Sequence, residues 1–349
     1  MEKACLRNSS IELLRIVCIL GIVIMHINGE SLKTCVGTNF LWAQLENSLF
    51  NAGVSIFVLI SGYYGIKRSV RRVYNLEFKV VFYSILSAIL GFVFFHDSIT
   101  VVLKSCIPVS TGKYWFITGY MLLMLFAPYV NATIDGMSKE SYRYFLTLMF
   151  VLFSLLPTFL YYHVLGGGGK NLGNMLFLYY LGAYIHKYVD LYSSRTNKIV
   201  ILFALILFFN IALNSVVSLV SGNSGVHGPF SRDCSMFIIM EAVLIFSTVA
   251  KIGTYNIVVN NIAKHVVSVY LLEGCVRRII ETYIFNWNQL IDRIYWPFVN
   301  ILCATAVVTI CLVLDSVLDK ILNPVRDRIY SFMSWMMSKI CSRICRTRC

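Results

Sequence analysis

The stretch IELLRIVCILGIVIMHINGE, residues 11–30, decides how this chain folds, because it is apolar over nearly its whole length. About 20 such residues allow an α-helix to cross the hydrocarbon core of a bilayer. Two ionisable residues, Arg15 and His26, lie eleven positions apart inside it. Eleven helical steps return to within roughly 20° of the starting direction and advance by about 16 Å, so both side chains share one face. Ionisable groups are costly inside a membrane and are candidates for function.

The composition extends this picture to the rest of the chain. Hydrophobic residues make up 58 %, charged residues 13 %, and the mean hydropathy is +0.73. A soluble domain carries roughly 25 % charged residues. We therefore predict an all-α integral membrane protein, a bundle of about ten transmembrane helices. The expected spans are 11–29, 48–66, 78–95, 114–131, 144–163, 171–187, 199–220, 235–250, 263–280 and 295–318.

Two regions follow from these spans: a transmembrane domain over residues 1–320 and a basic tail over 321–349. Most of the 30 lysine and arginine residues fall in segments on the same side as the N-terminus. The positive-inside rule therefore predicts that both termini, and so the tail, lie in the cytoplasm. This bias, together with attraction to anionic lipid headgroups, accounts for the net charge of +13. A nucleic-acid partner is not needed to explain it.

A small-residue pair and a basic cluster follow the second expected span. Ser61 and Gly62 would let another helix or a ligand approach closely. The basic residues that come next are Lys67, Arg68, Arg71 and Arg72. Taken alone, these features fit helix packing and charge that sets the topology. Together with Arg15, they fit equally well a positively charged entrance to a binding site for a phosphorylated cofactor.

Tyr114 and Trp115 precede the fourth expected span, in the motif TGKYWF. They have two interpretations: an aromatic belt at the membrane interface, or stacking against a sugar ring in an acceptor site. The glycine-rich stretch at 165–174 lacks the strand and the Lys-Ser/Thr pair of a phosphate loop and predicts a turn. Cysteine and histidine spacings indicate no metal site.

Glu273 is the second intramembrane charge of interest, in the ninth expected span. It lies about 15 Å along that helix, a depth comparable to that of His26. Buried opposite charges tend to pair, so Glu273 can orient His26 as the carboxylate of a catalytic triad does. The alternative is neutralisation by Arg277, one turn further along the same helix.

These motifs, in this order, resemble the membrane acyltransferase 3 family, ten-span O-acyltransferases of bacterial glycans. Arg15 and His26 match its Arg-x10-His signature, and Phe57 to Arg68 resemble its FxxSG element. The other matching segments are Tyr114–Phe116, Pro128–Asn131, FLYYLGAYI at 177–185 and SVYLLE at 268–273. The chain departs from the family at Glu273, where members often have histidine.

The resemblance implies an enzyme of the bacterial inner membrane that moves an acyl group, acetyl above all, from cytoplasmic acyl-CoA. The acceptor would be a hydroxyl of a cell-surface glycan or of its lipid-linked precursor. Acyl-CoA is then a donor substrate, with no permanently bound cofactor. His26 would act as general base or acyl carrier, with Glu273 beside it. Arg15, Ser61, Lys67, Arg68 and Arg71 would hold the donor, and Tyr114 and Trp115 the acceptor. The rival expectation is a transporter or flippase for a lipid-linked saccharide.

Overall fold

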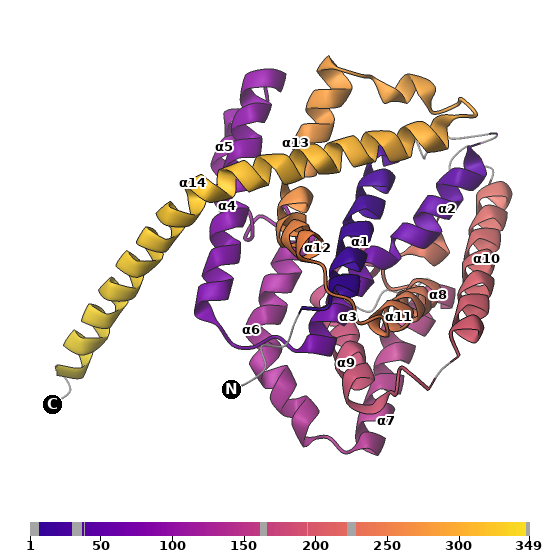
Figure 1. The fold of residues 1–349 in the computed structure, drawn as a ribbon, viewed down its shortest axis with the longest axis horizontal. Coiled ribbons are helices and arrows are strands. Elements are labelled where there is room, and N and C mark those ends of the chain that lie inside the picture. The colour runs from indigo at the N-terminus through magenta and orange to yellow at the C-terminus, as the bar shows by residue number, and fades with distance from the viewer. Residues whose placement is uncertain are drawn as a thin grey trace.

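The computed structural model describes residues 7–29, 37, 39–160, 166–193, 195–221 and 228–346, with side chains as far as residue 339. Every regular element in these ranges is helical (Figure 1). The elements are α1 (Ser9–Asn28), α2 (Phe40–Phe50), α3 (Ala52–Tyr64), α4 (Val70–Phe95), α5 (Ile99–Lys104), α6 (Trp115–Gly136), α7 (Lys139–Phe150), η2 (Val151–Leu155), α8 (Leu156–Leu160), η3 (Gly167–Gly169), α9 (Leu172–Tyr188), α10 (Thr196–Val220), η4 (Pro229–Ser231), α11 (Met236–Ala250), α12 (Ile257–Ile262), η5 (Ala263–His265), α13 (Val266–Tyr283), η6 (Trp287–Leu290) and α14 (Trp296–Arg346).

Seven helical stretches in the described ranges are long and apolar enough to cross a membrane. They are Ser9–Asn28, Phe40–Tyr64, Val70–Phe95, Trp115–Gly136, Lys139–Leu160, Thr196–Val220 and Trp296–Lys339. The prediction of an all-helical membrane protein is thus confirmed. The count of ten spans is not.

The remaining three expected spans correspond to α9, α11 and α13. All three are helical, but α9 has 17 residues and α11 has 15. Helix α13 is long enough to cross a membrane but is not apolar enough, because four charged residues fall within its 18 positions. These residues are Glu273, Arg277, Arg278 and Glu281. Length and composition alone therefore do not assign these helices to the membrane.

Helix α1 lies at the centre of the bundle. Of its membrane-length stretch, 56 % is buried inside the protein, against 17 % for α10. It packs against α2, α3, α11, α12, α13 and α14. Figure 1 shows α1 in the interior of the bundle, among these helices. Asn8 caps its first turn by accepting a hydrogen bond from the Ser10 backbone amide. The helix that carries Arg15 and His26 is thus surrounded by protein on most sides.

Helices α3 and α9 pack with their backbones almost in contact. A Cβ added at Gly62 of α3 would overlap the Tyr179 carbonyl, and one at Gly182 of α9 would overlap the Leu59 carbonyl. Small residues permit this close approach between membrane helices. The interpretation of Gly62 as a packing position is consistent with this contact.

We expect Gly62→Ala to lower stability by roughly 1–3 kcal/mol, because the new methyl group must displace the α9 backbone. Gly274→Ala is the matched control, since a Cβ there meets nothing within 4 Å. Thermal unfolding of both variants in nanodiscs measures the difference. Equal melting temperatures would contradict the close α3–α9 contact.

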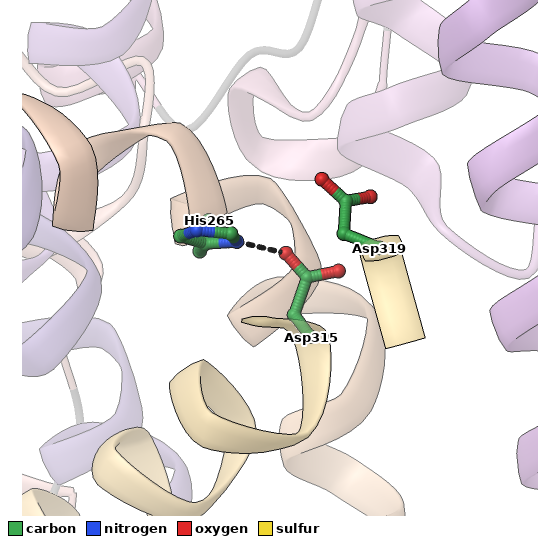
Figure 2. Close-up of side chains that lie close together, drawn as sticks. All are labelled: His265, Asp315 and Asp319. Atoms are coloured by element: carbon green, nitrogen blue, oxygen red, sulfur yellow. Dashed lines mark hydrogen bonds and ion pairs between the residues drawn. The ribbon is translucent and has the colours of Figure 1, made fainter. Parts of the chain in front are cut away.

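A buried ionic network joins α4, η5 and α14. His265 Nδ1 lies 2.5 Å from Asp315 Oδ2, and Asp319 lies one turn further along α14 (Figure 2). Lys79 Nζ lies 3.0 Å from Asp315 and 3.4 Å from Asp319, and Tyr83 donates to the Asp315 carboxylate. The grouping of histidine and carboxylates resembles a metal site, but the Lys79 ammonium already supplies the neutralising charge and would repel a cation. The network therefore links α4, η5 and α14 through side-chain contacts.

Helix α14 continues past residue 320, the expected boundary between membrane domain and tail. It runs from Trp296 to Arg346 with Pro324 inside it, and Figure 1 shows it bending away from the bundle. The extension contacts the first turns of α4, where Arg71 forms an ion pair of 3.2 Å with Asp327 and Tyr74 donates to the Arg326 carbonyl at 3.3 Å.

Candidate active site

A single large cavity brings most of the predicted site residues together. Its volume is about 840 Å³, within the roughly 300–1,000 Å³ typical of ligand sites. Its walls come from α1, α3, α4, α6 and α13 and from the segments before α9 and α11. The predicted residues that line it are Arg15, His26, Ser61, Tyr114, Trp115 and Glu273.

His26 and Glu273 are in direct contact inside this cavity. His26 Nδ1 lies 2.9 Å from Glu273 Oε1. When Glu273 is ionised it can only accept a hydrogen bond, so the neutral imidazole then donates from Nδ1 and keeps Nε2 as its basic nitrogen. The His26 side chain is 42 % exposed while that of Glu273 is 9 % exposed, so the imidazole opens into the cavity and the carboxylate lies behind it.

The alternative pairing of Glu273 is also present. Arg277 Nε lies 3.5 Å from Glu273 Oε2, an ion pair too loose to be a hydrogen bond here. The two carboxylate oxygens therefore face different groups. One contacts His26 and the other lies near Arg277, so both contacts that the sequence offered for Glu273 are present.

Arg15 lies in the first half of α1, and it lines the same cavity as His26 from nearer the N-terminus of that helix. Its guanidinium donates to Glu12 Oε2 at 3.0 Å and sits 6.0 Å from the centre of the Phe57 ring. Glu12 is shared with Arg7, whose Nε lies 2.6 Å from the other oxygen. Two arginines thus share one carboxylate, and the group keeps a net positive charge beside the cavity.

The four residues of the basic cluster after α3 differ in their relation to the cavity. Lys67, Arg68 and Arg71 are exposed and do not line the cavity, whereas Arg72 does. Arg71 instead contacts α14, through Asp327 and the Tyr330 ring. Neighbouring positions in a helix point about 100° apart, and at the start of α4 it is Arg72, not Arg71, that lies on the cavity side. Sequence spacing alone gave no reason to prefer Arg72.

The aromatic residues of the YWF motif line the cavity. Tyr114 donates to the Leu271 carbonyl at 3.2 Å and packs against Tyr270, and Phe116 stacks on Tyr120. Ser61 donates to the Phe57 carbonyl and lies 3.1 Å from the Tyr120 hydroxyl. An aromatic wall therefore extends from the Arg15 region towards the His26–Glu273 pair. Tyr114 and Trp115 therefore lie on the cavity wall.

Two further cavity residues come from connecting segments and were missed by sequence reasoning. Lys170 follows η3, and its ammonium lies 5.7 Å from the centre of the Trp115 ring. Asp233 follows η4 and is 5 % exposed. Burial raises the pKa of the Asp233 carboxyl to about 6, an effect that the nearby Lys170 charge partly offsets. Neither residue stands in a periodic pattern, so the sequence carried no signal for them.

The fold and the cavity define a class: a helical membrane protein with an arginine, a histidine and a carboxylate in one internal cavity. The chain belongs to the acyltransferase 3 family, whose acyltransferase domain model matches residues 8–315. The match includes every predicted site residue and supports an acyltransferase activity. No curated protein and no solved structure matches the chain.

Proposed function

We propose that this protein transfers an acyl group, acetyl in the first instance, from cytoplasmic acyl-CoA to a hydroxyl of a cell-surface glycan or its lipid-linked precursor. The observation that carries the proposal is the contact between His26 and Glu273 in a cavity shared with Arg15. The family assignment supports the transfer of an acyl group. In this proposal the protein resides in the bacterial inner membrane with both termini in the cytoplasm.

The donor would enter from the side on which α1 begins. Arg15 and Arg72 line the cavity there, and the exposed Lys67 and Arg68 add positive charge nearby. Arginine donates paired hydrogen bonds to phosphate oxygens, so these residues suit the phosphates of CoA. The pantetheine arm would then follow the aromatic wall to His26, about 16 Å further along α1.

The chemistry assigned to His26 is general-base catalysis. Nε2 takes the proton of the acceptor hydroxyl as its oxygen attacks the thioester carbonyl. The carbon–sulfur bond breaks, and the departing CoA thiolate takes the proton from the imidazolium, which gives an ester and free CoA. The alternative use of the same nitrogen is nucleophilic: Nε2 attacks the thioester carbonyl, the carbon–sulfur bond breaks and CoA departs as the thiolate. The hydroxyl oxygen then takes the acyl group from Nε2, and the hydroxyl proton ends on the CoA thiolate. Glu273 supports either route by holding the ring and offsetting its positive charge.

The test uses membranes that contain the protein and membranes from the same host without it. Both are supplied with acetyl-CoA labelled in the acetyl group, and two products are followed: free CoA thiol and label in extractable glycan. We expect both to depend on the protein. Absence of both products would contradict the acetyl-transfer proposal. Transport of a lipid-linked saccharide without consumption of acetyl-CoA would instead favour the transporter alternative.

We expect Arg15→Lys to raise the KM for acetyl-CoA by roughly tenfold while kcat changes little. Lysine keeps the charge but loses the two-pronged geometry that binds phosphate. Arg71→Lys is the matched control, because Arg71 faces α14 and lies outside the cavity. The measurement is initial CoA release against acetyl-CoA concentration. An unchanged KM in Arg15→Lys would argue against Arg15 as a donor ligand.

A further inference from the structure

Asp233 differs from the other carboxylates that line the cavity. Glu12 pairs with Arg7 and Arg15, Glu273 with His26 and Arg277, and Asp97 with Arg278. Within the described residues, no group donates a hydrogen bond to the Asp233 carboxylate or lies within ion-pair distance of it. It is nevertheless 5 % exposed and faces the cavity. A carboxylate that faces the cavity without a donor from the described protein is open to hydrogen bonds from a ligand.

The position of Asp233 is fixed by its backbone. The Asp233 carbonyl accepts a hydrogen bond from the Asn174 side-chain Nδ2 at 3.2 Å, and the Cys234 backbone amide donates to the Gly168 carbonyl at 3.3 Å. A Cβ at Gly169 would overlap the Cys234 backbone, so the two segments lie directly against each other. The segment before α9 and the segment before α11 therefore form one rigid support for the carboxylate.

The surroundings of Asp233 indicate the chemistry of that ligand. Trp115 provides a half-buried aromatic surface on the cavity wall, and the Lys170 ammonium lies beside the ring. An aromatic face, a carboxylate acceptor and an ammonium donor suit a sugar ring, which has apolar C–H faces and hydroxyl groups that donate and accept. The negative charge of Asp233 would disfavour a sugar that carries its own carboxylate.

We infer that Asp233, Trp115 and Lys170 form the binding subsite for the acceptor, an uncharged sugar ring with neighbouring hydroxyls that donate to the Asp233 carboxylate. This inference rests on the proposed glycan acceptor and adds its chemical class. Asp233 then discriminates among acceptors, whereas His26 performs the transfer. A site that depends on hydroxyl donors rejects rings that lack them, because its buried acceptor would stay unpaired.

The test measures binding directly, so that it does not depend on transfer. The full chain is placed in nanodiscs, because sugar-based detergents would compete for the site. Saturation-transfer NMR at pH 7.5 gives the Kd of two probes, methyl α-D-glucopyranoside and methyl α-D-glucuronide. The variants are Asp233→Asn, which keeps one acceptor oxygen, and Asp233→Leu, which keeps none. The control is Asp292→Asn, an exposed aspartate outside the cavity.

We expect wild-type protein to bind the glucoside at least about tenfold more tightly than the glucuronide. Asp233→Asn should weaken glucoside binding by roughly tenfold and abolish the preference, since a hydrogen bond to a charged acceptor is lost. Asp233→Leu should abolish detectable binding, and both variants should bind acetyl-CoA like wild type. Asp292→Asn should change nothing.

The inference is overturned if wild type binds neither probe, if Asp233→Leu leaves glucoside binding intact, or if Asp292→Asn has the same effect as Asp233→Asn. Failure of the proposed function gives a different result. In that case the glucoside binds in an Asp233-dependent manner, but wild-type membranes transfer no label from acetyl-CoA.

Discussion

Replacing His26 by alanine is expected to lower the rate of acyl transfer by roughly 10²- to 10⁴-fold, the usual contribution of a positioned acid–base group. His26 opens into the cavity, and its Nδ1 contacts Glu273, so in the proposed mechanism Nε2 would be the atom that reaches the acceptor hydroxyl. Because the donor phosphates would be bound at the Arg15 side of the cavity, the KM for acetyl-CoA should change by no more than about twofold. Initial rates of CoA release measure both quantities.

The matched control for this variant is His186→Ala. His186 lies in α9, packs edge-on against the Tyr63 ring and does not line the cavity. It should therefore keep wild-type activity at equal expression. Equal rates in His26→Ala and wild type would remove His26 from the mechanism. Labelled protein that accumulates without acceptor, and only when His26 is present, would favour the acyl-carrier route over the general-base route.

Glu273→Gln is expected to have the second large effect. We expect it to lower kcat by roughly 10²- to 10⁴-fold. The upper end matches the loss seen when the carboxylate of a catalytic triad becomes an amide. An amide carries no charge to stabilise the imidazolium and can present its NH₂ group to Nδ1, which would select the wrong tautomer. Since Glu273 acts through His26, the KM for acetyl-CoA should stay near its wild-type value.

A separate comparison distinguishes this positioning role from a merely structural one. Glu241→Gln also replaces with an amide a buried carboxyl group within a helix, one that accepts a hydrogen bond from Asn210 at 3.1 Å and does not line the cavity. It should retain activity. Glu273→Asp, which keeps the charge, should recover part of the rate lost in Glu273→Gln. Parallel losses of folded protein and of activity in all three variants would refute the positioning role.

Helical periodicity explains why part of the site could be predicted from the sequence. The eleven-residue spacing of Arg15 and His26 gives their common face because α1 is regular from Ser9 to Asn28. Comparable depth made Glu273 a candidate partner for His26, but sequence could not choose between His26 and Arg277. The contact joins residues 247 positions apart, and only the packing of α13 against α1 brings them together.

The basic cluster shows the opposite case. Lys67, Arg68, Arg71 and Arg72 are equivalent as charges in a sequence, yet only Arg72 lines the cavity. The difference comes from the direction in which α4 begins and from the extension of α14, which engages Arg71. Such choices depend on the orientation of one helix relative to another, which no local pattern encodes.

Composition and periodicity alone determined that this chain is a helical membrane protein with an arginine and a histidine on one face of its first helix. These properties are local, because a 3.6-residue repeat and an apolar run act within one segment. The tertiary structure decided that Glu273 contacts His26, that Arg72 rather than Arg71 lines the cavity, and that Asp233 and Lys170 line the same cavity as Trp115. These arrangements join distant segments, and their geometry is fixed only when helices and connecting segments pack together.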